Sequence, residues 1–325
     1  MKGLRYYTQW GKFFGKSAFY VRHFAAYMVP RCWWRRHRWQ GSKDWDEATW
    51  QHIRERAEYY NHMSPTQAGT DWTRVGDYRY PFGQKKKFSC YFFDLYEHLK
   101  YFGPDLRVRY LFGDIIEVET EPTIVKSRPI RGDNGNSVVI NLDKLRHFKF
   151  LKDTIPFEAK KDLIISRNFV TQPHRKRFIE MYLDHPMCDV GQINPSTEHP
   201  EWVKPFVLLQ EQLSYKFICC VEGNDVATNL KWVMSSNSLA VMPRPTYETW
   251  FMEGTLIPNY HYVEIKADFS DLPERMQYYI DHPDEARAII DHAHEYIRQF
   301  QDPRIEQAVA HEVLTRYFTL SGQQP

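Results

Sequence analysis

One carboxylate in the chain is placed to take a proton from a hydroxyl group. Asp114 directly follows Gly113 and the short apolar run 108–112, which predicts a strand. A carboxylate at the carboxyl end of a strand can project into a cleft and act as a general base. The alternative is an ordinary turn aspartate, because Asp beside Gly is common in turns. We favour the catalytic interpretation, with three fallback candidates in the following loop: Glu117, Glu119 and Glu121.

Positive charge gathers around a second predicted strand end. The run 162–166 predicts a strand, and 173–183 predicts a helix with bases near its start. Arg167 and Arg175 flank this turn, and guanidinium groups offer the paired donors that suit a diphosphate. The alternative is a solvated basic helix face, which we prefer only for the neighbouring Lys176.

The longest informative stretch of the chain is 216–265. Its pattern predicts a buried strand over 216–221, a turn at Glu222-Gly223-Asn224-Asp225, a helix over 226–234 and a second buried strand over 238–242. Such a unit places free backbone N–H groups beside a strand end, where open α/β sheets bind phosphate-bearing ligands. Lys231 on this helix is either a phosphate ligand or an exposed cation, and we slightly prefer the exposed cation.

The order and spacing of these features resemble glycosyltransferase family 90. The resemblance is closest to the bacterial LpsA-type branch of lipopolysaccharide core enzymes, which is related to the Rumi-type protein O-glucosyltransferases. It runs from about Val108 to about Phe300. The features that carry it are the Lys216-Phe217 strand, Gly223, Lys231, Ser238-Leu239, Trp250-Phe251, Leu256 with Pro258, and His261-Tyr262-Val263.

The resemblance implies an α/β protein of GT-B type, with two Rossmann-like domains that face a cleft. It implies inverting transfer of a hexose or pentose from a UDP-sugar to a hydroxyl of a glycan or glycolipid, with no metal and no further cofactor. Asp114 matches the family's catalytic base. The implied UDP-sugar-binding residues are Arg167, Thr171, Arg175, Glu222, Gly223, Asn224, Asn229 and Lys231.

Several positions depart from the family pattern. Glu222 stands where the Rumi-type branch has Arg, and Ala227 and Asn229 stand where it has Ser and Arg. Asn168 replaces a Gly, although Asn tolerates positive φ nearly as well. These departures keep a second hypothesis open, in which the protein is a non-catalytic nucleotide-sugar or membrane-binding module with the same fold.

Composition restricts the class of protein. The chain has 325 residues, 42% hydrophobic and 26% charged, with a net charge of +2, which is ordinary for a soluble protein. Its five cysteines are odd in number and include no CxxC, so we expect reduced thiols and a cytoplasmic protein. No run of roughly 20 apolar residues predicts a spanning helix.

The basic, aromatic segment 1–40 contains no Asp or Glu. Cations and Trp or Tyr rings suit an anionic membrane surface, so one hypothesis is a peripheral anchor on the inner face of the cytoplasmic membrane. The other is a helix pair that packs its aromatic side chains on the fold. Both stay open, and a nucleic-acid-binding arm is a weaker third hypothesis that we do not adopt.

The expected organisation has four parts. After the segment 1–40 come an acceptor-side domain over 41–155, a nucleotide-sugar domain over 156–300, and a last helix within 301–325 that crosses back to the first domain. Asp44 and Asp46 form a DxD, a metal-binding signature in other glycosyltransferases. We interpret it as a helix cap, since an acid before a predicted helix is an ordinary N-cap.

Overall fold

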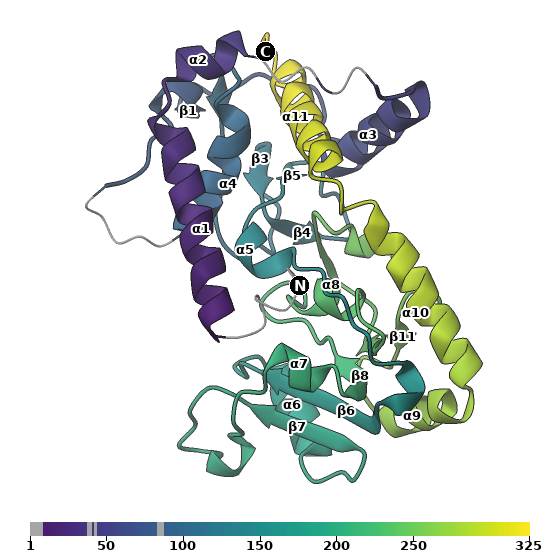
Figure 1. Cartoon of the computed structure of the whole chain (residues 1–325). Coiled ribbons are helices and arrows are strands. Elements are labelled where there is room, and N and C mark those ends of the chain that lie inside the picture. The colour runs from purple at the N-terminus through teal and green to yellow at the C-terminus, as the bar shows by residue number, and fades with distance from the viewer. Residues whose placement is uncertain (1–8, 38–40, 42–43, 83–87) are drawn as a thin grey trace. The chain divides into compact units, whose positions relative to one another are not determined.

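The computed structural model describes residues 9–37, 41, 44–82 and 88–325 (Figure 1). The chain divides into two compact units, each of which is described by itself. Unit 1 contains residues 147–245 and 255–299, and unit 2 contains residues 16–146, 246–254 and 300–325. Of the described start of the chain, residues 9–15 are grouped with unit 1, so the helix Gln9–Met28 is divided between the two units and is described with unit 2. The segment 246–254 thus belongs to unit 2, although the residues on either side of it belong to unit 1. The domain boundaries expected from the sequence include no such excursion.

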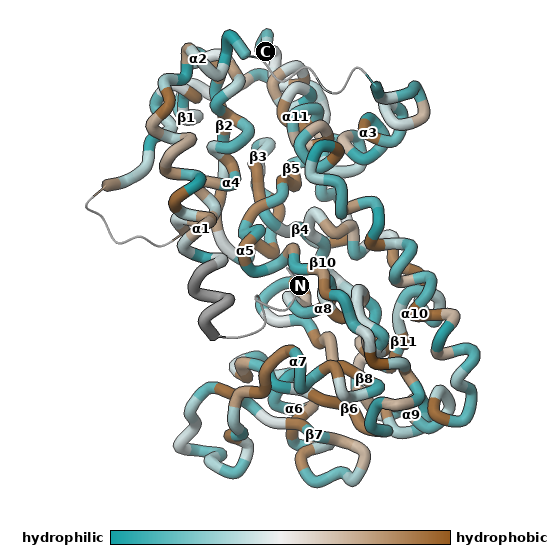
Figure 2. Tube along the Cα trace, viewed as in Figure 1, coloured by the Kyte–Doolittle hydropathy of each residue, from teal (hydrophilic) through white to brown (hydrophobic). Residues whose placement is uncertain are grey.

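Unit 1 is built on a five-stranded parallel sheet in the order β7-β6-β8-β9-β11. Every residue of β8 and β9 is buried, as expected for strands covered on both faces. Figure 2 shows hydrophobic residues along β6 and β8. The predicted strands of the central stretch are therefore confirmed. The bounds are β6 (Lys161–Asn168), β7 (Cys188–Gln192), β8 (Tyr215–Cys219), β9 (Leu239–Met242) and β11 (Val263–Glu264).

The strand order contains a topological switch point. The chain passes from β6 to β7 on one side, then returns to place β8 on the other side of β6. In open α/β sheets, the loops that follow two such strands diverge, and ligands bind between them. The loops after β6 and β8 are the two that the sequence singled out for phosphate binding.

Helices complete unit 1. α10 shows why they form, because its buried residues Ala286, Ile289, Ile290, Ala293 and Ile297 recur at helical spacing along one face. The predicted helix over 173–183 is confirmed to within one residue. The helices are α6 (Pro173–Tyr182), α7 (Leu209–Gln212), α8 (Leu230–Val233), α9 (Leu272–Asp281) and α10 (Pro283–Arg298).

Unit 2 combines longer helices with short strands. Its described strands pair two by two: β1 with β2, β3 with β5 in parallel, and β4 with β10. They do not form the single sheet that a second Rossmann-like domain would carry, although the α/β class holds. The bounds are α1 (Gln9–Met28), α2 (Arg31–Arg36), α3 (Glu47–Tyr60), α4 (Ser89–Leu99), α5 (Lys144–His147), α11 (Pro303–Leu320), β1 (Thr73–Arg74), β2 (Arg107–Val108), β3 (Thr123–Val125), β4 (Ser127–Pro129), β5 (Ser137–Val139) and β10 (Tyr247–Thr249).

Two aromatic residues of α1, Phe24 and Tyr27, pack against α4. The Phe24 ring lies 4.7 Å from that of Phe93, and the Tyr27 ring lies 4.9 Å from that of Tyr96. Packing on the fold therefore describes these side chains, whereas residues 1–8 and 38–40 of the same segment lie outside the described residues. No helix in the described part of the chain is long and apolar enough to cross a membrane.

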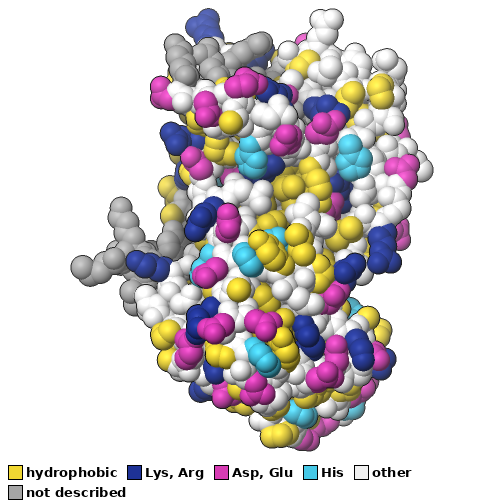
Figure 3. Space-filling view, turned by 90° about the vertical axis from the view of Figure 1, so that its right-hand side faces the viewer, with side chains coloured by type: hydrophobic (Ala, Val, Ile, Leu, Met, Phe, Trp, Pro, Cys, Tyr) yellow, Lys and Arg dark blue, Asp and Glu magenta, His cyan; other side chains and the backbone are white. Residues whose placement is uncertain are grey.

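Charge is mixed on the surface. On the face drawn in Figure 3, Lys and Arg side chains are interspersed with Asp and Glu side chains. Nucleic-acid-binding proteins instead gather bases into a patch or stripe. Among the described residues on this face, the structure gives no support to the nucleic-acid hypothesis.

Candidate functional site

Arg175 joins the two loops of the switch point in unit 1. It lies in the first turn of α6, which begins at Pro173, a residue whose fixed φ suits that position. Its guanidinium donates three hydrogen bonds of 2.8 Å, from Nε to the Glu222 carbonyl, from Nη2 to the Val221 carbonyl and from Nη1 to the Phe169 carbonyl. Burial lowers the pKa of this group below its usual value. Since arginine has five N–H donors, these bonds leave two for a ligand.

The neighbouring loop residues are held by further hydrogen bonds. His174 Nε2 donates to the Glu222 carbonyl at 2.8 Å, and Gln172 Nε2 donates to Asn224 Oδ1 at 2.7 Å. A Cβ atom added to Gly223 would lie 3.1 Å from Arg175 Nη2, so glycine lets the guanidinium approach the backbone. The loops after β6 and β8 are therefore fixed against each other before any ligand binds.

Arg167 is engaged differently. Its Nη2 donates to Asp189 Oδ1 at 2.6 Å, its Nη1 donates to the Asp189 carbonyl at 2.7 Å, and its side chain is 6% exposed. Burial alone would raise the pKa of Asp189, but hydrogen bonds from Arg167 and Tyr215 lower it below its usual value. These contacts tie β6 to β7 and use donors that the sequence interpretation assigned to a diphosphate.

The other three predicted UDP-sugar residues occupy distinct positions. Thr171 is exposed in the loop after β6, and Asn229 Nδ2 donates to the Cys219 carbonyl at 2.9 Å, at the end of β8. Lys231 is 0% exposed. Our preference for an exposed cation at Lys231 is therefore wrong, because α8 is a single turn packed into the unit rather than a surface helix.

Unit 2 contains a cluster of charges around Asp114. Asp114 follows Gly113, whose φ of +127° permits a sharp turn that other residues rarely adopt. Asp114 Oδ1 accepts hydrogen bonds from Lys126 Nζ at 2.5 Å and from Arg146 Nη2 at 3.4 Å. The side chain of Lys126 is 1% exposed, whereas that of Asp114 is 27% exposed. The buried ammonium of Lys126 therefore orients the Asp114 carboxylate, which stays partly open to solvent.

Parallel strand ends bring this cluster together. Tyr110 bridges Ile124 in parallel, and β3 pairs with β5 in parallel, so the three segments end at one edge. Asp114, Lys126 and Arg146 each follow one of these segments. Arg146 Nε also lies 2.9 Å from Asp143 Oδ2. Sequence reasoning missed Lys126, and its only signal was a cation at the end of an apolar run.

Two comparisons with known proteins bear on both units. The model for glycosyl transferase family 90 matches residues 178–325. The O-glucosyltransferase LpsA of Dichelobacter nodosus is 38% identical over 313 residues, which cover 95% of this chain and 97% of that protein. The chain belongs to glycosyltransferase family 90.

Membership of family 90 makes the protein a glycosyltransferase, with a sugar donor and an acceptor as substrates. The family match continues to residue 325, so ending the resemblance at about Phe300 was too early. The match with the relative extends over nearly the whole chain, including the first hundred residues that carried no resemblance in the sequence. The match therefore takes in residues of both units.

Two of the three fallback carboxylates, Glu119 and Glu121, form ion pairs with Arg109. Arg109 Nη2 lies 2.7 Å from Glu119 Oε2, and Arg109 Nη1 lies 2.9 Å from Glu121 Oε2. Glu117 is exposed. Of these four candidates, Asp114 is the one that the described structure shows partly exposed and held by two cations.

Acidic groups that could suggest a metal have other partners. Asp46 Oδ1 accepts the Thr49 backbone N–H at 2.8 Å as the N-cap of α3, as the sequence indicated. His23, Asp94 and Glu97 offer ligand atoms within 4.8 Å of one another. However, Lys144 Nζ lies 2.6 Å from Glu97 Oε2 and already neutralises that carboxylate. We assign no metal to this group.

Proposed function

We propose that this family 90 protein transfers a hexose or pentose from a UDP-sugar to a hydroxyl group, with inversion at the anomeric carbon. The carrying observation is the pre-formed pair of loops at the β6/β8 switch point, fixed by Arg175, in a chain that separately presents Asp114. In the proposed step, Asp114 takes the proton of the acceptor hydroxyl and its oxygen bonds to the anomeric carbon. The bond to UDP breaks, and the diphosphate leaves with the electron pair.

Unit 1 is proposed to bind the donor and unit 2 the acceptor, as in a GT-B enzyme. The N-terminus of α6 and the remaining donors of Arg175 suit a departing diphosphate, because both favour negative charge. Thr171, Glu222, Gly223, Asn224, Asn229 and Lys231 are proposed to complete this site together with Arg167. For Arg167 we propose an indirect contribution, through the pairing of β6 with β7.

The acceptor is proposed to be a glycan or glycolipid such as lipopolysaccharide core or a similar surface glycan. The decisive experiment is a panel of UDP-sugars, first for binding and then for release of UDP with and without glycan acceptors. Turnover of one UDP-sugar supports the transferase. Binding of UDP-sugars without any turnover supports the alternative, a non-catalytic module with the same fold.

We expect Arg175→Ala to weaken UDP binding by about 1.5–3 kcal/mol, the size of a charge-assisted hydrogen bond. The change removes donors to the ligand and also releases the loops after β6 and β8. Isothermal titration with UDP measures the effect. Lys176→Ala is the matched control, because Lys176 is adjacent and exposed. Equal loss in both variants would contradict the assignment.

We expect transfer activity to persist in EDTA, since the proposed mechanism neutralises the diphosphate with protein groups rather than Mg²⁺. The assay compares initial rates with and without the chelator. Loss of activity on chelation, restored by Mg²⁺ or Mn²⁺, would overturn metal independence and return Asp44 and Asp46 to consideration.

Peripheral contact with the inner face of the cytoplasmic membrane is proposed through the solvent side of α1. Val21 and Met28 on this helix are 70% and 75% exposed, beside the exposed bases Lys16 and Arg22. We expect binding to vesicles that contain an anionic lipid, reduced in Val21→Asp/Met28→Asp. Val203→Asp in unit 1 is the control. Equal binding by all three proteins would dismiss this contact.

A further inference from the structure

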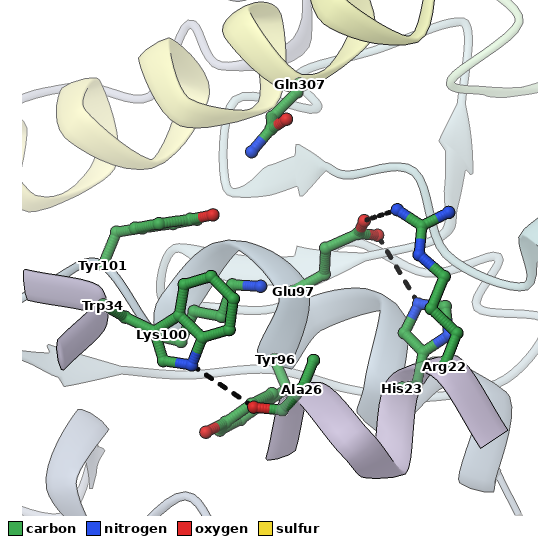
Figure 4. Close-up of a pocket in the computed structure, with 9 residues that line it drawn as sticks. All are labelled: Arg22, His23, Ala26, Trp34, Tyr96, Glu97, Lys100, Tyr101 and Gln307. Carbon is green, nitrogen blue, oxygen red and sulfur yellow. Dashed lines mark hydrogen bonds and ion pairs between the residues drawn. The ribbon is translucent and has the colours of Figure 1, made fainter. Parts of the chain in front are cut away.

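A cavity of about 240 Å³ lies within unit 2. Its walls come from α1, α2, α4 and α11 and from the residues that follow α4 (Figure 4). The cavity is smaller than the roughly 300–1,000 Å³ of sites for drug-sized ligands, so it suits a single ring. The side chains that matter for its chemistry are Arg22, Trp34, Glu97, Lys100, Tyr101 and Gln307.

Lys100 brings an uncompensated positive charge to this cavity. The residue is 6% exposed, and its Nζ lies 3.7 Å from the centre of the Trp34 ring and 5.1 Å from that of Tyr101. Among the described residues, none forms a hydrogen bond or ion pair with this ammonium group. Burial lowers the pKa of Lys100 to about 8, although Glu97 raises it. The group therefore stays charged at pH 7, and buried charges normally have a partner.

Glu97 does not provide that partner, because Lys144 already neutralises it. Its Oε2 lies 2.6 Å from Lys144 Nζ, and its Oε1 lies 3.9 Å from Arg22 Nη2. The Arg22 side chain is 80% exposed beside the cavity. One carboxylate cancels one cation, and the close partner of Glu97 is Lys144. The remaining cations, Lys100 and Arg22, leave the lining with a net positive charge, which favours an anion.

The cavity also offers groups that hydroxyls can bind. In Figure 4 the Glu97 carboxylate, the Gln307 amide and the Tyr101 hydroxyl border the same space as the Lys100 ammonium. Carboxylate and amide oxygens accept hydrogen bonds from hydroxyls, while the amide N–H groups donate. A carboxylate in the wall disfavours a bare phosphate ion. The lining instead fits a ligand that carries hydroxyls and one anionic group on a small ring.

We propose that this cavity binds an anionic monosaccharide unit, a sugar ring that carries a phosphate or a carboxylate. Lys100 and Arg22 bind the anionic group, Trp34 and Tyr101 border the ring, and Glu97 and Gln307 take its hydroxyls. The site shares no residue with the Asp114 cluster or with the switch point in unit 1. It is a second carbohydrate site, and it does not depend on which residues transfer the sugar.

The test is titration of the full chain with glucose 6-phosphate and glucuronate, compared with glucose and inorganic phosphate. We expect at least one of the two anionic sugars to bind about tenfold or more tightly than both glucose and phosphate. Tighter binding of glucose 6-phosphate identifies a phosphate ligand, and tighter binding of glucuronate identifies a carboxylate. If glucose or inorganic phosphate binds as tightly as both anionic sugars, the proposal is overturned.

Variants locate the site. Lys100→Met keeps the length of the side chain and removes its charge, so we expect an affinity loss of about tenfold with an unchanged melting temperature. Arg22→Gln should also weaken binding, whereas Lys16→Gln, an exposed base on the same helix, should not. Arg175→Ala should bind the anionic sugar with the affinity of the wild-type protein. A folded Lys100→Met that binds like wild type, or loss of binding in Arg175→Ala, overturns the proposal whatever the result for UDP.

Discussion

We expect Asp114→Asn to lower kcat by about 10²–10⁴-fold while affinity for the UDP-sugar stays nearly unchanged. A general base acts in the transition state, so its loss affects the chemical step more than donor binding. The amide keeps the shape of the side chain and can still accept a hydrogen bond from Lys126. The measurement is kcat and KM with the acceptor identified by the UDP-sugar panel, together with UDP affinity.

Loss of the Asp114 charge has a second consequence that must be separated from the first. Lys126 is 1% exposed, and without the carboxylate its ammonium loses an ionic partner at 2.5 Å. Removing an ionic partner from a buried charge destabilises the fold. We therefore expect Asp114→Asn/Lys126→Met to recover stability relative to Asp114→Asn but not to recover kcat. Recovery of the rate would show that misplacement, rather than loss of the base, caused the defect.

Glu117→Gln is the matched control in the same loop. Glu117 is exposed, and of the three fallback glutamates it is the one for which the described structure gives no arginine partner. We expect a wild-type rate for this variant. A wild-type rate for Asp114→Asn would instead contradict the assignment and make Glu117 the next carboxylate to test.

The parallel sheet of unit 1 was predictable because of its burial. Strands covered on both faces form continuous apolar runs, and the runs 216–221 and 238–242 became β8 and β9. In unit 2 the strands are two or three residues long, too short for any period to show. Their pairing depends on residues far apart in the chain, so no local pattern predicted three separate two-stranded sheets.

The loops of the candidate site were predictable from the sequence, but the residues that its side chains contact were not. Turn residues and basic helix starts marked the loops after β6 and β8. The engagement of Arg167 depends on β7 lying beside β6, where Ile165 pairs with Asp189 in register. A single sequence contains no signal for that neighbour. The burial of Lys231 was missed for the same reason, because side-chain exposure on a single helical turn follows from tertiary packing.

The excursion 246–254 shows how a non-local contact can organise a unit. β10 pairs with β4, and Glu248 Oε1 accepts a hydrogen bond from Arg128 Nε at 2.7 Å, 120 residues away in sequence. Both side chains are almost fully buried, at 2% and 4% exposure. Trp250 from the same segment stacks on Tyr60 with ring centres 3.9 Å apart. These contacts hold the segment in unit 2, although its flanking residues belong to unit 1.

We expect Glu248→Leu to lower the free energy of unfolding of unit 2 by about 3–5 kcal/mol, because it leaves the Arg128 guanidinium buried without its carboxylate. Arg128→Leu should cost a similar amount, since it also removes donors to the Tyr59 and Tyr60 carbonyls. Denaturant unfolding followed by far-UV circular dichroism measures the change. Arg131→Leu, an exposed base two residues beyond β4, is the control and should change stability by less than about 0.5 kcal/mol.

The double variant Arg128→Leu/Glu248→Leu distinguishes a coupled pair from two independent contributions. With both charges of this pair removed, neither is left buried without the other, so we expect the double variant to lose less stability than the sum of the single losses. Coupling between residues in direct contact is typically about 0.5–3 kcal/mol. If the losses simply add, Arg128 and Glu248 act independently, and the carbonyls and hydroxyl around them hold the segment. If the coupling appears, this ion pair is what fixes 246–254 in unit 2.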